Sequence, residues 1–219
     1  MIPRLSGPLL PPASGAAKHA VVLLHGYGSD GNDLIGLGHT WSPNFPDVLF
    51  VSPNAPEACA VNPGGYQWFA LDLDRVADDR RLAGALAARP AIAQFLDDLW
   101  TQTRLTPEQT VLAGFSQGAM MALHTGLSLD RKLAGILSFS GALLRPENFP
   151  QPQAIRPPVA LIHGEFDPVV EPNLSREAEQ KLKATGYDVR LHVSPGIGHS
   201  ISTDGLQFAS GFLGRAFGN

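Results

Sequence analysis

Cysteine and long hydrophobic runs are both scarce in this chain of 219 residues. Its single cysteine, Cys59, excludes an intrachain disulfide and a metal site built from several thiolates, so we interpret it as a small, half-buried residue in a loop. No stretch approaches the roughly 18 uninterrupted apolar residues of a membrane span. Residues 1–10 lack the apolar core of a signal peptide. We therefore expect a cytoplasmic protein without stable membrane insertion.

Lysine is also scarce, occurring only at Lys18, Lys132, Lys181 and Lys183, and the net charge is -4. No basic cluster appears in the sequence and the net charge gives no electrostatic case for nucleic acid, so we expect no nucleic-acid partner. No repeat, linker or low-complexity tract divides the sequence, so we predict a single domain over 1–219. Residues 1–17, rich in Pro, Gly, Ala and Ser, are expected to form an edge strand or a loose arm.

Short apolar runs alternate with helical patterns along the chain. The runs predict buried strands at 20–24, 48–51, 110–113, 133–139 and 159–162, and an alternating pattern predicts the last strand at 188–193. The helical patterns fall at 33–37, 74–103, 173–185 and 201–217. Pro90 is expected to break or kink the second helix, and Asn173 to cap the third. This alternation predicts an α/β fold with a mostly parallel sheet and helices on both faces. Functional groups of such sheets gather at the carboxyl ends of the strands.

The segment Gly114-Phe115-Ser116-Gln117-Gly118 lies between a predicted strand and a predicted helix. Gly-x-Ser-x-Gly in that setting is the sequence form of a nucleophile elbow. The turn is tight, so the residues two before and two after the serine must lack bulk. It presents the serine hydroxyl above the sheet, at the positive end of a helix. We predict that Ser116 attacks the carbonyl carbon of an ester or thioester.

A serine nucleophile needs a base, and that base needs an orienting carboxylate. In an alpha/beta-hydrolase these groups follow in the order Ser, Asp or Glu, His. Asp167 follows the predicted strand 159–162, and His199 follows the predicted strand 188–193. We therefore predict that His199 takes the proton of Ser116 and that Asp167 orients His199.

Other acids and histidines compete for these roles. Glu165 lies in the same turn as Asp167 and is the main rival acid, whereas Asp204 comes after His199. His192 lies inside a strand pattern, and His163 precedes Asp167, which is the wrong order.

Two further histidines receive supporting roles. We expect His124 to pack within the elbow helix. We expect His25 to support the neighbouring loop, with direct proton transfer as the alternative.

The tetrahedral intermediate needs hydrogen-bond donors for its oxyanion, each contributing about 3 kcal/mol. The backbone N–H of Gln117, directly after the nucleophile, is one expected donor. The other is the backbone N–H of Tyr27, because Gly26 and Gly28 let the chain approach a substrate closely.

The irregular stretch 53–70 is long for a compact domain and carries aromatic residues, so we expect an ordered functional loop. Within it, Trp68 and Phe69 are predicted to line a substrate groove. The alternative is that both residues pack the edge of the sheet.

Four segments together resemble the phospholipase/carboxylesterase family, which includes acyl-protein thioesterases and small bacterial carboxylesterases. They are 23–30 (LLHGYGSD), 68–69 (WF), 114–118 (GFSQG) and 163–170 (HGEFDPVV). The resemblance runs from about Ala20 to the C-terminus. Two positions depart from it, since members often have glycine where this chain has Ala119 and aspartate where it has Ala70.

The resemblance implies an alpha/beta-hydrolase without a large lid domain and without a metal or organic cofactor. By resemblance, Ser116, Asp167 and His199 form the triad, and the N–H groups of Tyr27 and Gln117 form the oxyanion hole. It also makes a homodimer a possible assembly.

The sequence thus predicts a carboxylesterase that forms an acyl-serine intermediate on short- to medium-chain esters. The first alternative is a lysophospholipase or acyl-protein thioesterase acting on long acyl chains. The second is a non-catalytic binding protein with a hydrolase fold.

Overall fold

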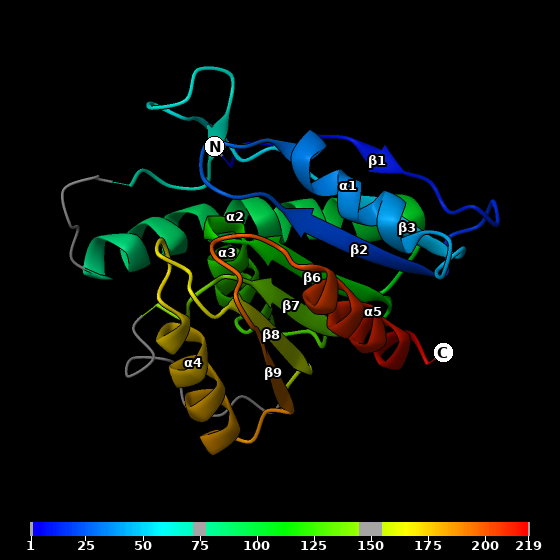
Figure 1. The fold of residues 1–219 in the computed structure, drawn as a ribbon. Helices are drawn as coiled ribbons and strands as arrows, with labels where there is room; N and C mark the ends of the chain where they lie inside the picture. The colour runs from blue at the N-terminus through cyan, green and yellow to red at the C-terminus, as the bar shows by residue number, and fades with distance from the viewer. Residues whose placement is uncertain (1, 72–77, 145–154, 219) are drawn as a thin grey trace.

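A computed structural model describes residues 2–71, 78–144 and 155–218 of the chain, and within them seven strands form one sheet (Figure 1). Their order is β1-β3-β2-β6-β7-β8-β9. The strands are β1 (Leu9–Leu10), β2 (His19–Leu24), β3 (Val48–Val51), β6 (Thr110–Phe115), β7 (Gly135–Phe139), β8 (Val159–Gly164) and β9 (Val189–Ser194). All neighbours from β3 to β9 are parallel, which places the carboxyl ends of β2, β6, β8 and β9 at one edge.

The first strand, β1, is an antiparallel edge strand in which Leu9 pairs with Val51 of β3. The N-terminal segment therefore contains the edge strand that its composition left open. Because β1 is short and occupies the outer side of β3, it limits the length of unpaired strand edge at this end of the sheet.

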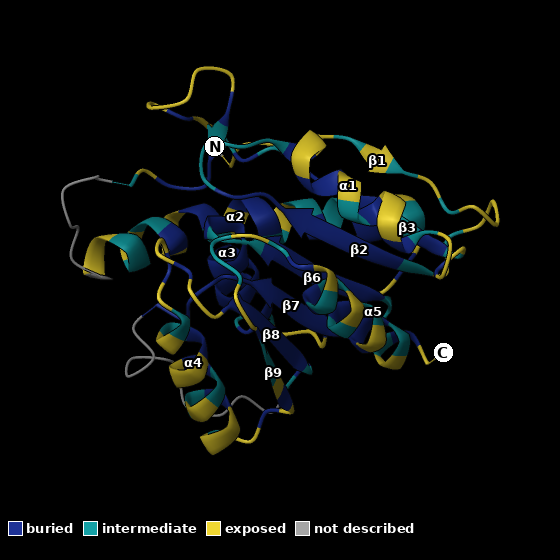
Figure 2. Ribbon diagram, in the orientation of Figure 1, coloured by how far each residue is buried: buried dark blue, intermediate teal, exposed yellow. Residues whose placement is uncertain are grey.

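Helices cover both faces of the sheet. On one face lie α1 (Gly31–Trp41) and α5 (Thr203–Phe217), and on the other lie α2 (Asp78–Thr103), α3 (Gln117–Gly126) and α4 (Pro172–Ala184). Alternate side chains of each central strand point to opposite faces: Val21 and Leu23 belong to the buried cluster on the side of α1 and α5, and Val22 and Leu24 to the cluster on the side of the other three helices. Figure 2 shows the resulting buried strands between partly exposed helices.

The first helix, α1, is longer than the predicted segment 33–37. It begins after Asp30, whose side chain accepts hydrogen bonds from the backbone N–H groups of Asn32 and Asp33. Gly38 lies against the ring of Phe50, and a Cβ at Gly38 would lie 2.9 Å from that side chain. The glycines of α1 have low helix propensity, so the sequence pattern predicts too short a helix. At Gly38, however, the packing requires glycine.

The second helix, α2, continues through Pro90 to Thr103, so the expectation that Pro90 would break it is wrong. Pro90 lies on the exposed face of α2, and so does Leu86. Because proline has no backbone N–H, the carbonyl of Leu86 receives no helical hydrogen bond from position 90. Water can satisfy that carbonyl, which makes the proline tolerable there. The start of the predicted helix, 74–77, lies outside the described residues.

The helix α4 begins at Pro172 after the N-cap residue Glu171, so Asn173 is not the cap. Proline suits the first position of a helix because its fixed φ is helical and its missing N–H would have no partner there. The predicted end is correct, since Gly186 follows the helix with a φ of 85°.

The stretch 53–70 is ordered and contains a small hairpin of β4 (Glu57–Ala58) and β5 (Tyr66–Gln67). The hairpin is joined to the loop after β2 by a bridge between Ser29 and Tyr66. Cys59, directly after β4, is buried rather than half-buried. Trp68 and Phe69, which directly follow this hairpin, therefore lie at the edge of the sheet formed by the carboxyl ends of β2 and β6.

Candidate active site

Ser116 lies in a sharp turn between β6 and α3. Its φ of 54° and ψ of −118° are unusual for a residue with a side chain, and such a conformation costs about 1–3 kcal/mol. Gly114 and Gly118 pack directly on each other, and a Cβ at Gly114 would lie only 2.7 Å from the backbone nitrogen of Ala119. The expected absence of bulk on both sides of Ser116 is therefore a steric requirement of this turn.

His199, in the loop between β9 and α5, joins Ser116 to Asp167. Its Nε2 lies 3.0 Å from Ser116 Oγ, and its Nδ1 lies 2.7 Å from Asp167 Oδ2. An ionised carboxylate only accepts hydrogen bonds, so the proton of the neutral ring belongs on Nδ1. Nε2 is then left with its lone pair directed at the serine hydroxyl.

Asp167 is held as a carboxylate by several donors. Its side chain is fully buried, and its Oδ1 accepts hydrogen bonds from the backbone N–H groups of Val169 and Val170, both at 2.9 Å. Burial alone would raise the pKa of Asp167, but the hydrogen bonds from His199, Val170 and Val169 outweigh it and hold the pKa below its ordinary value. A charged acid is thus available to orient His199 at neutral pH.

His163, at the end of β8, supports the loop that carries Asp167. Its Nε2 donates to the carbonyl of Val170 at 2.8 Å, and its Nδ1 accepts from Ser175 Oγ of α4 at 2.7 Å. The Nε2 atom also lies 3.3 Å from Asp167 Oδ2. Burial lowers the pKa of His163. The order of residues along the chain excluded His163 as the base, but it did not predict the supporting role. The His-x-x-x-Asp spacing of His163 and Asp167 was the sequence signal that could have indicated it.

The rival acids contact other partners. Glu165 is exposed, and its Oε2 accepts a hydrogen bond from the backbone N–H of Gly196 at 3.0 Å, so it supports the loop that leads to His199. Asp204 Oδ2 lies 2.7 Å from His192 Nε2, on the surface at α5. Neither carboxylate contacts His199 through a hydrogen bond in the described part of the chain.

His25 and His124 are both buried. His25 Nε2 accepts from the backbone N–H of Ala55 at 3.0 Å, and its Nδ1 donates to the carbonyl of Gly26 at 2.8 Å. Both nitrogens are occupied, and burial lowers the pKa, which fits support of the loop rather than proton transfer. His124 Nε2 accepts from the backbone N–H of Leu144, and burial lowers its pKa to about 4, as expected of a packing residue.

The two expected oxyanion donors come from neighbouring segments. The N–H of Gln117 is the first of α3 and has no partner within that helix. Tyr27 lies in the loop after β2, where a Cβ at Gly26 would be 3.6 Å from the Cβ of Ser116. The loop therefore lies directly beside the serine.

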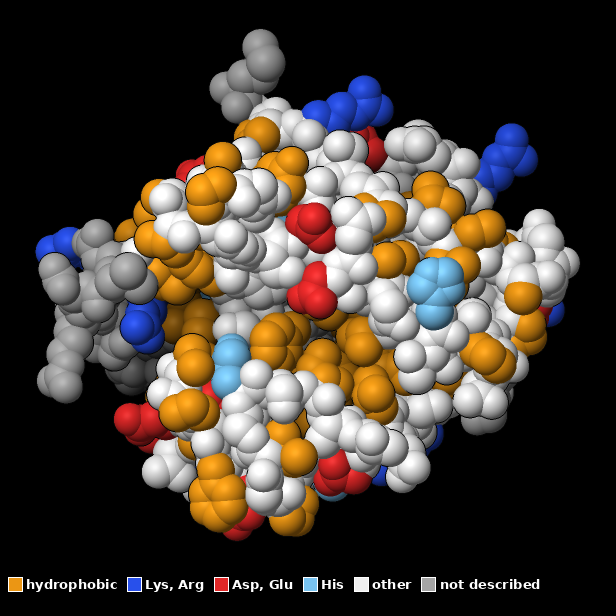
Figure 3. Space-filling view, turned by 45° about the horizontal axis from the view of Figure 1, so that its top comes forward, with side chains coloured by type: hydrophobic (Ala, Val, Ile, Leu, Met, Phe, Trp, Pro, Cys, Tyr) orange, Lys and Arg blue, Asp and Glu red, His pale blue; other side chains and the backbone are white. Residues whose placement is uncertain are grey.

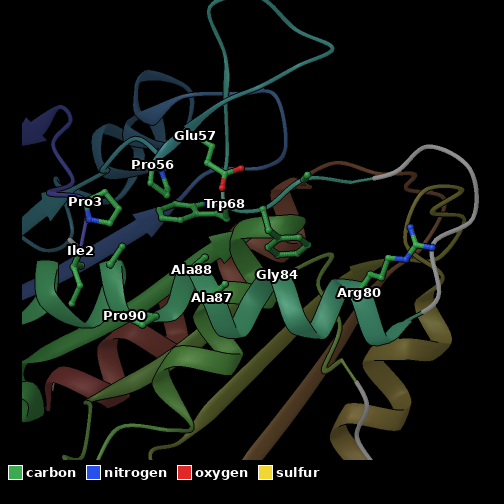
Figure 4. A pocket seen from close by; sticks show the side chains of 13 residues that line it. Ile2, Pro3, Pro56, Glu57, Trp68, Arg80, Gly84, Ala87, Ala88 and Pro90 are labelled. Carbon is green, nitrogen blue, oxygen red and sulfur yellow. The ribbon is translucent and has the colours of Figure 1, made fainter.

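Trp68 and Phe69 are almost fully buried and line a cavity of about 650 Å³. Figure 4 shows Trp68 and Glu57 on one side of this cavity and α2 on the other, where the lining residues include Gly84, Ala87 and Ala88. Ser116 and His199 are not among the residues that line it. The two aromatic residues thus border a groove, but one that does not contain the serine hydroxyl.

Apolar side chains also gather around a hollow on the face shown in Figure 3, with a histidine side chain at its border. In the loop of Asp167, the side chains of Phe166 and Val169 are 68% and 67% exposed. Exposed apolar side chains therefore flank the buried acid on both sides.

Comparison with known proteins adds a family to this geometry. A model of the phospholipase/carboxylesterase family matches residues 10–216. The chain belongs to this family. It is therefore a carboxylesterase-family hydrolase, and the resemblance seen in the sequence is confirmed. The crystal structure of esterase PE8 matches at a TM-score of 0.93 with 56% identity, over 96% of this chain and 98% of that one. This match confirms the predicted alpha/beta-hydrolase fold.

Two curated family members illustrate the range of relatives. The chain is 33% identical to acyl-protein thioesterase 1 of Neurospora crassa, over 94% of this chain and 90% of the relative. It is 31% identical to esterase YpfH of Escherichia coli K12, over 88% of this chain and 81% of the relative. Among the residues that the structure describes, no helix is both long and apolar enough to cross a membrane.

Proposed function

We propose that this protein hydrolyses carboxylic esters of short- to medium-chain acids through an acyl-serine intermediate. The observation that carries the proposal is the unbroken chain of contacts from Ser116 Oγ through the His199 ring to Asp167. A base within hydrogen-bond reach of the nucleophile, itself held by a buried acid, is the arrangement that activates a serine.

In this reaction His199 Nε2 takes the proton of Ser116 as Oγ attacks the ester carbonyl carbon. The N–H groups of Tyr27 and Gln117 stabilise the negative charge on the former carbonyl oxygen. His199 then returns the proton to the departing alcohol, which leaves the acyl group on Ser116. A water molecule attacks this acyl-enzyme with the same base, releasing the carboxylic acid and restoring the serine.

A second candidate is a thioesterase or lysophospholipase that accepts long acyl chains. The Neurospora crassa relative is named as an acyl-protein thioesterase, and the exposed Phe166 and Val169 could contact an apolar chain. Nitrophenyl esters, acyl thioesters and lysophospholipids of increasing chain length separate the two. A steep fall in kcat/KM beyond medium chains supports the esterase, and a rise toward long chains supports the second candidate.

The decisive test is Ser116→Ala. We expect kcat for a nitrophenyl ester to fall by about 10⁴-fold or more, because the covalent step is lost. Circular dichroism and the urea midpoint verify that the variant is folded. Ser128→Ala, just after the end of α3, is the matched control and should retain full activity.

Labelling by a fluorophosphonate gives an independent measurement. The reagent should modify the wild type at Ser116 and leave the Ser116→Ala variant unlabelled. Retained hydrolysis by Ser116→Ala would contradict the proposal. A wild type that neither hydrolyses any substrate of the panel nor reacts with the fluorophosphonate would support a non-catalytic binding protein instead.

A further inference from the structure

Trp68 connects the two segments that carry the expected oxyanion donors. Its indole N–H donates to the carbonyl of His25 at 2.9 Å, in the loop two residues before Tyr27. Its backbone N–H donates to Oε1 of Gln117 at 3.0 Å, on the elbow. One residue of the loop after β5 is therefore bound to both halves of the oxyanion site.

The Gln117 side chain completes this connection. Its Nε2 donates to the carbonyl of Phe69 at 2.7 Å, so the amide group bonds to the backbone on both sides of the Trp68–Phe69 peptide. Gln117 is 2% exposed and Trp68 is 1% exposed, so water does not replace these bonds when they are lost. The amide thereby fixes where the 68–69 backbone lies relative to the elbow.

The two oxyanion segments are also in direct contact. Gly118 of the elbow packs against the carbonyls of Leu24 and His25, and a Cβ at Gly118 would collide with both. The carbonyl of His25 thus faces the elbow helix and at the same time receives the indole N–H of Trp68. A shift of Trp68 would be transmitted to the His25–Tyr27 loop and to Gln117 together.

We propose that Trp68 is a positioning residue for catalysis, which fixes the spacing between the N–H groups of Tyr27 and Gln117. This inference rests on the proposed ester hydrolysis and assigns Trp68 a role beyond lining the groove. The oxyanion develops only as Ser116 attacks, so correct spacing of the donors stabilises the transition state and not the bound ester. Loss of the Trp68 contacts should therefore lower kcat and leave KM nearly unchanged.

Trp68→Phe tests the indole contact, because phenylalanine keeps an aromatic ring but has no N–H group. Displacement of catalytic groups by about 1 Å can cost about 100-fold, so we expect a fall in kcat of about 10- to 100-fold. The KM for a nitrophenyl ester should remain within about twofold. In a trifluoromethyl ketone, Ser116 Oγ adds to the carbonyl carbon and the carbonyl oxygen becomes an oxyanion. The affinity of Trp68→Phe for this inhibitor should fall in proportion to its kcat.

Trp100→Phe is a matched control. Trp100 is also buried, and its indole N–H donates to Thr110 Oγ1 at the same distance of 2.9 Å. Thr110 begins β6, whereas Ser116 follows its other end, so the control lies at the opposite edge of the sheet. Trp100→Phe should lower the urea midpoint much as Trp68→Phe does, with kcat within about twofold of wild type.

Gln117→Met provides a second variant if Trp68→Phe does not fold. Methionine has a similar length, keeps the backbone N–H of residue 117 and removes both amide hydrogen bonds. It should reproduce the fall in kcat at nearly constant KM. The double variant with Trp68→Phe should lose less than the product of the two single losses, because both changes release the same segment.

Two results would overturn the inference. One is an unchanged kcat in Trp68→Phe or Gln117→Met. The other is a rise in KM and an altered chain-length profile with kcat preserved, which is the signature of a groove-lining residue alone. Either result leaves the Ser116→Ala test intact, so failure of this inference is distinguishable from failure of the proposed hydrolysis.

Discussion

Two histidine–aspartate pairs in this protein have the same contact distance and differ in almost everything else. His199 contacts Asp167 and His192 contacts Asp204, each at 2.7 Å. In the first pair Nδ1 faces the carboxylate, which leaves Nε2 for Ser116. In the second pair Nε2 itself faces the carboxylate, and the ring stacks on Phe208 with centroids 5.0 Å apart.

The surroundings of the two acids differ as well. The side chain of Asp167 is fully buried, whereas that of Asp204 is 44% exposed. Hydrogen bonds from Ser202 and His192 hold the pKa of Asp204 well below its ordinary value. Both acids are therefore charged at neutral pH, and the comparison teaches that a short histidine–aspartate contact does not by itself indicate a catalytic pair. The ring nitrogen that remains available, and what it faces, distinguishes the two.

The largest difference between the pairs should appear when each histidine is replaced. We expect His199→Gln to lower kcat by roughly 10⁴- to 10⁶-fold, because the serine loses its base. His192→Gln should stay within about twofold of wild type, since single surface changes away from a site have small effects. Initial rates with a nitrophenyl ester measure both. A comparable loss of kcat in His199→Gln and His192→Gln would show that the two pairs do not differ in function.

The second largest difference in kcat should appear when the acid of each pair is replaced. In Asp167→Asn the amide NH₂ can donate to Nδ1 of His199, which moves the ring proton to Nε2 and prevents it from accepting the Ser116 proton. We expect kcat to fall by about 10⁴-fold with the fold retained. Asp204→Asn is the matched control and should keep kcat within about twofold. Full activity of Asp167→Asn would show that His199 does not need this acid.

Stability against acid should reveal what the surface pair does. The lowered pKa of Asp204 means that the folded state binds its proton less readily than the unfolded state. Its contribution to stability is therefore present above the unfolded pKa of about 3.9 and is lost as the pH falls below it. Asp204→Asn should have a lower urea midpoint than the wild type at pH 7. Near pH 3 the two urea midpoints should lie closer together.

Glu177→Gln, an exposed change on α4, is the control for this smallest effect. Its urea midpoint should follow the wild type at both pH values. An Asp204→Asn midpoint that differs from wild type by the same amount at pH 7 and pH 3 would show that the carboxylate charge is not the cause.

Much of the sheet could be predicted because its central strands are largely continuous apolar runs. Burial on both faces leaves no polar alternation, and the central strands accordingly lie within about two residues of their predicted bounds. The contacts among Ser116, Asp167 and His199 also agree with the sequence argument, since parallel strands bring their carboxyl ends to one edge. The catalytic role of these residues stays a prediction for the kinetic tests.

The features that escaped prediction depend on contacts between distant residues. Helix propensity argues against α1, but the fit of Gly38 on Phe50 requires glycine there. Pro90 is tolerated in α2 because it lies on the exposed face, which the sequence pattern did not reveal. The bonds of Trp68 to His25 and Gln117 span 43 and 49 residues, and no local pattern encodes them.

The order of the residues along the chain also has a consequence during synthesis. Ser116 precedes His199 by 83 residues. At ribosomal rates of about 5–20 residues per second, roughly 4–17 s separate the emergence of Ser116 from that of His199. Until the end of that interval the growing chain carries β6 and the elbow sequence without the complete loop that holds the imidazole. We therefore expect the proposed hydrolysis to begin only after the segment that carries His199 has left the ribosome and folded, so that a shorter growing chain would not act on esters.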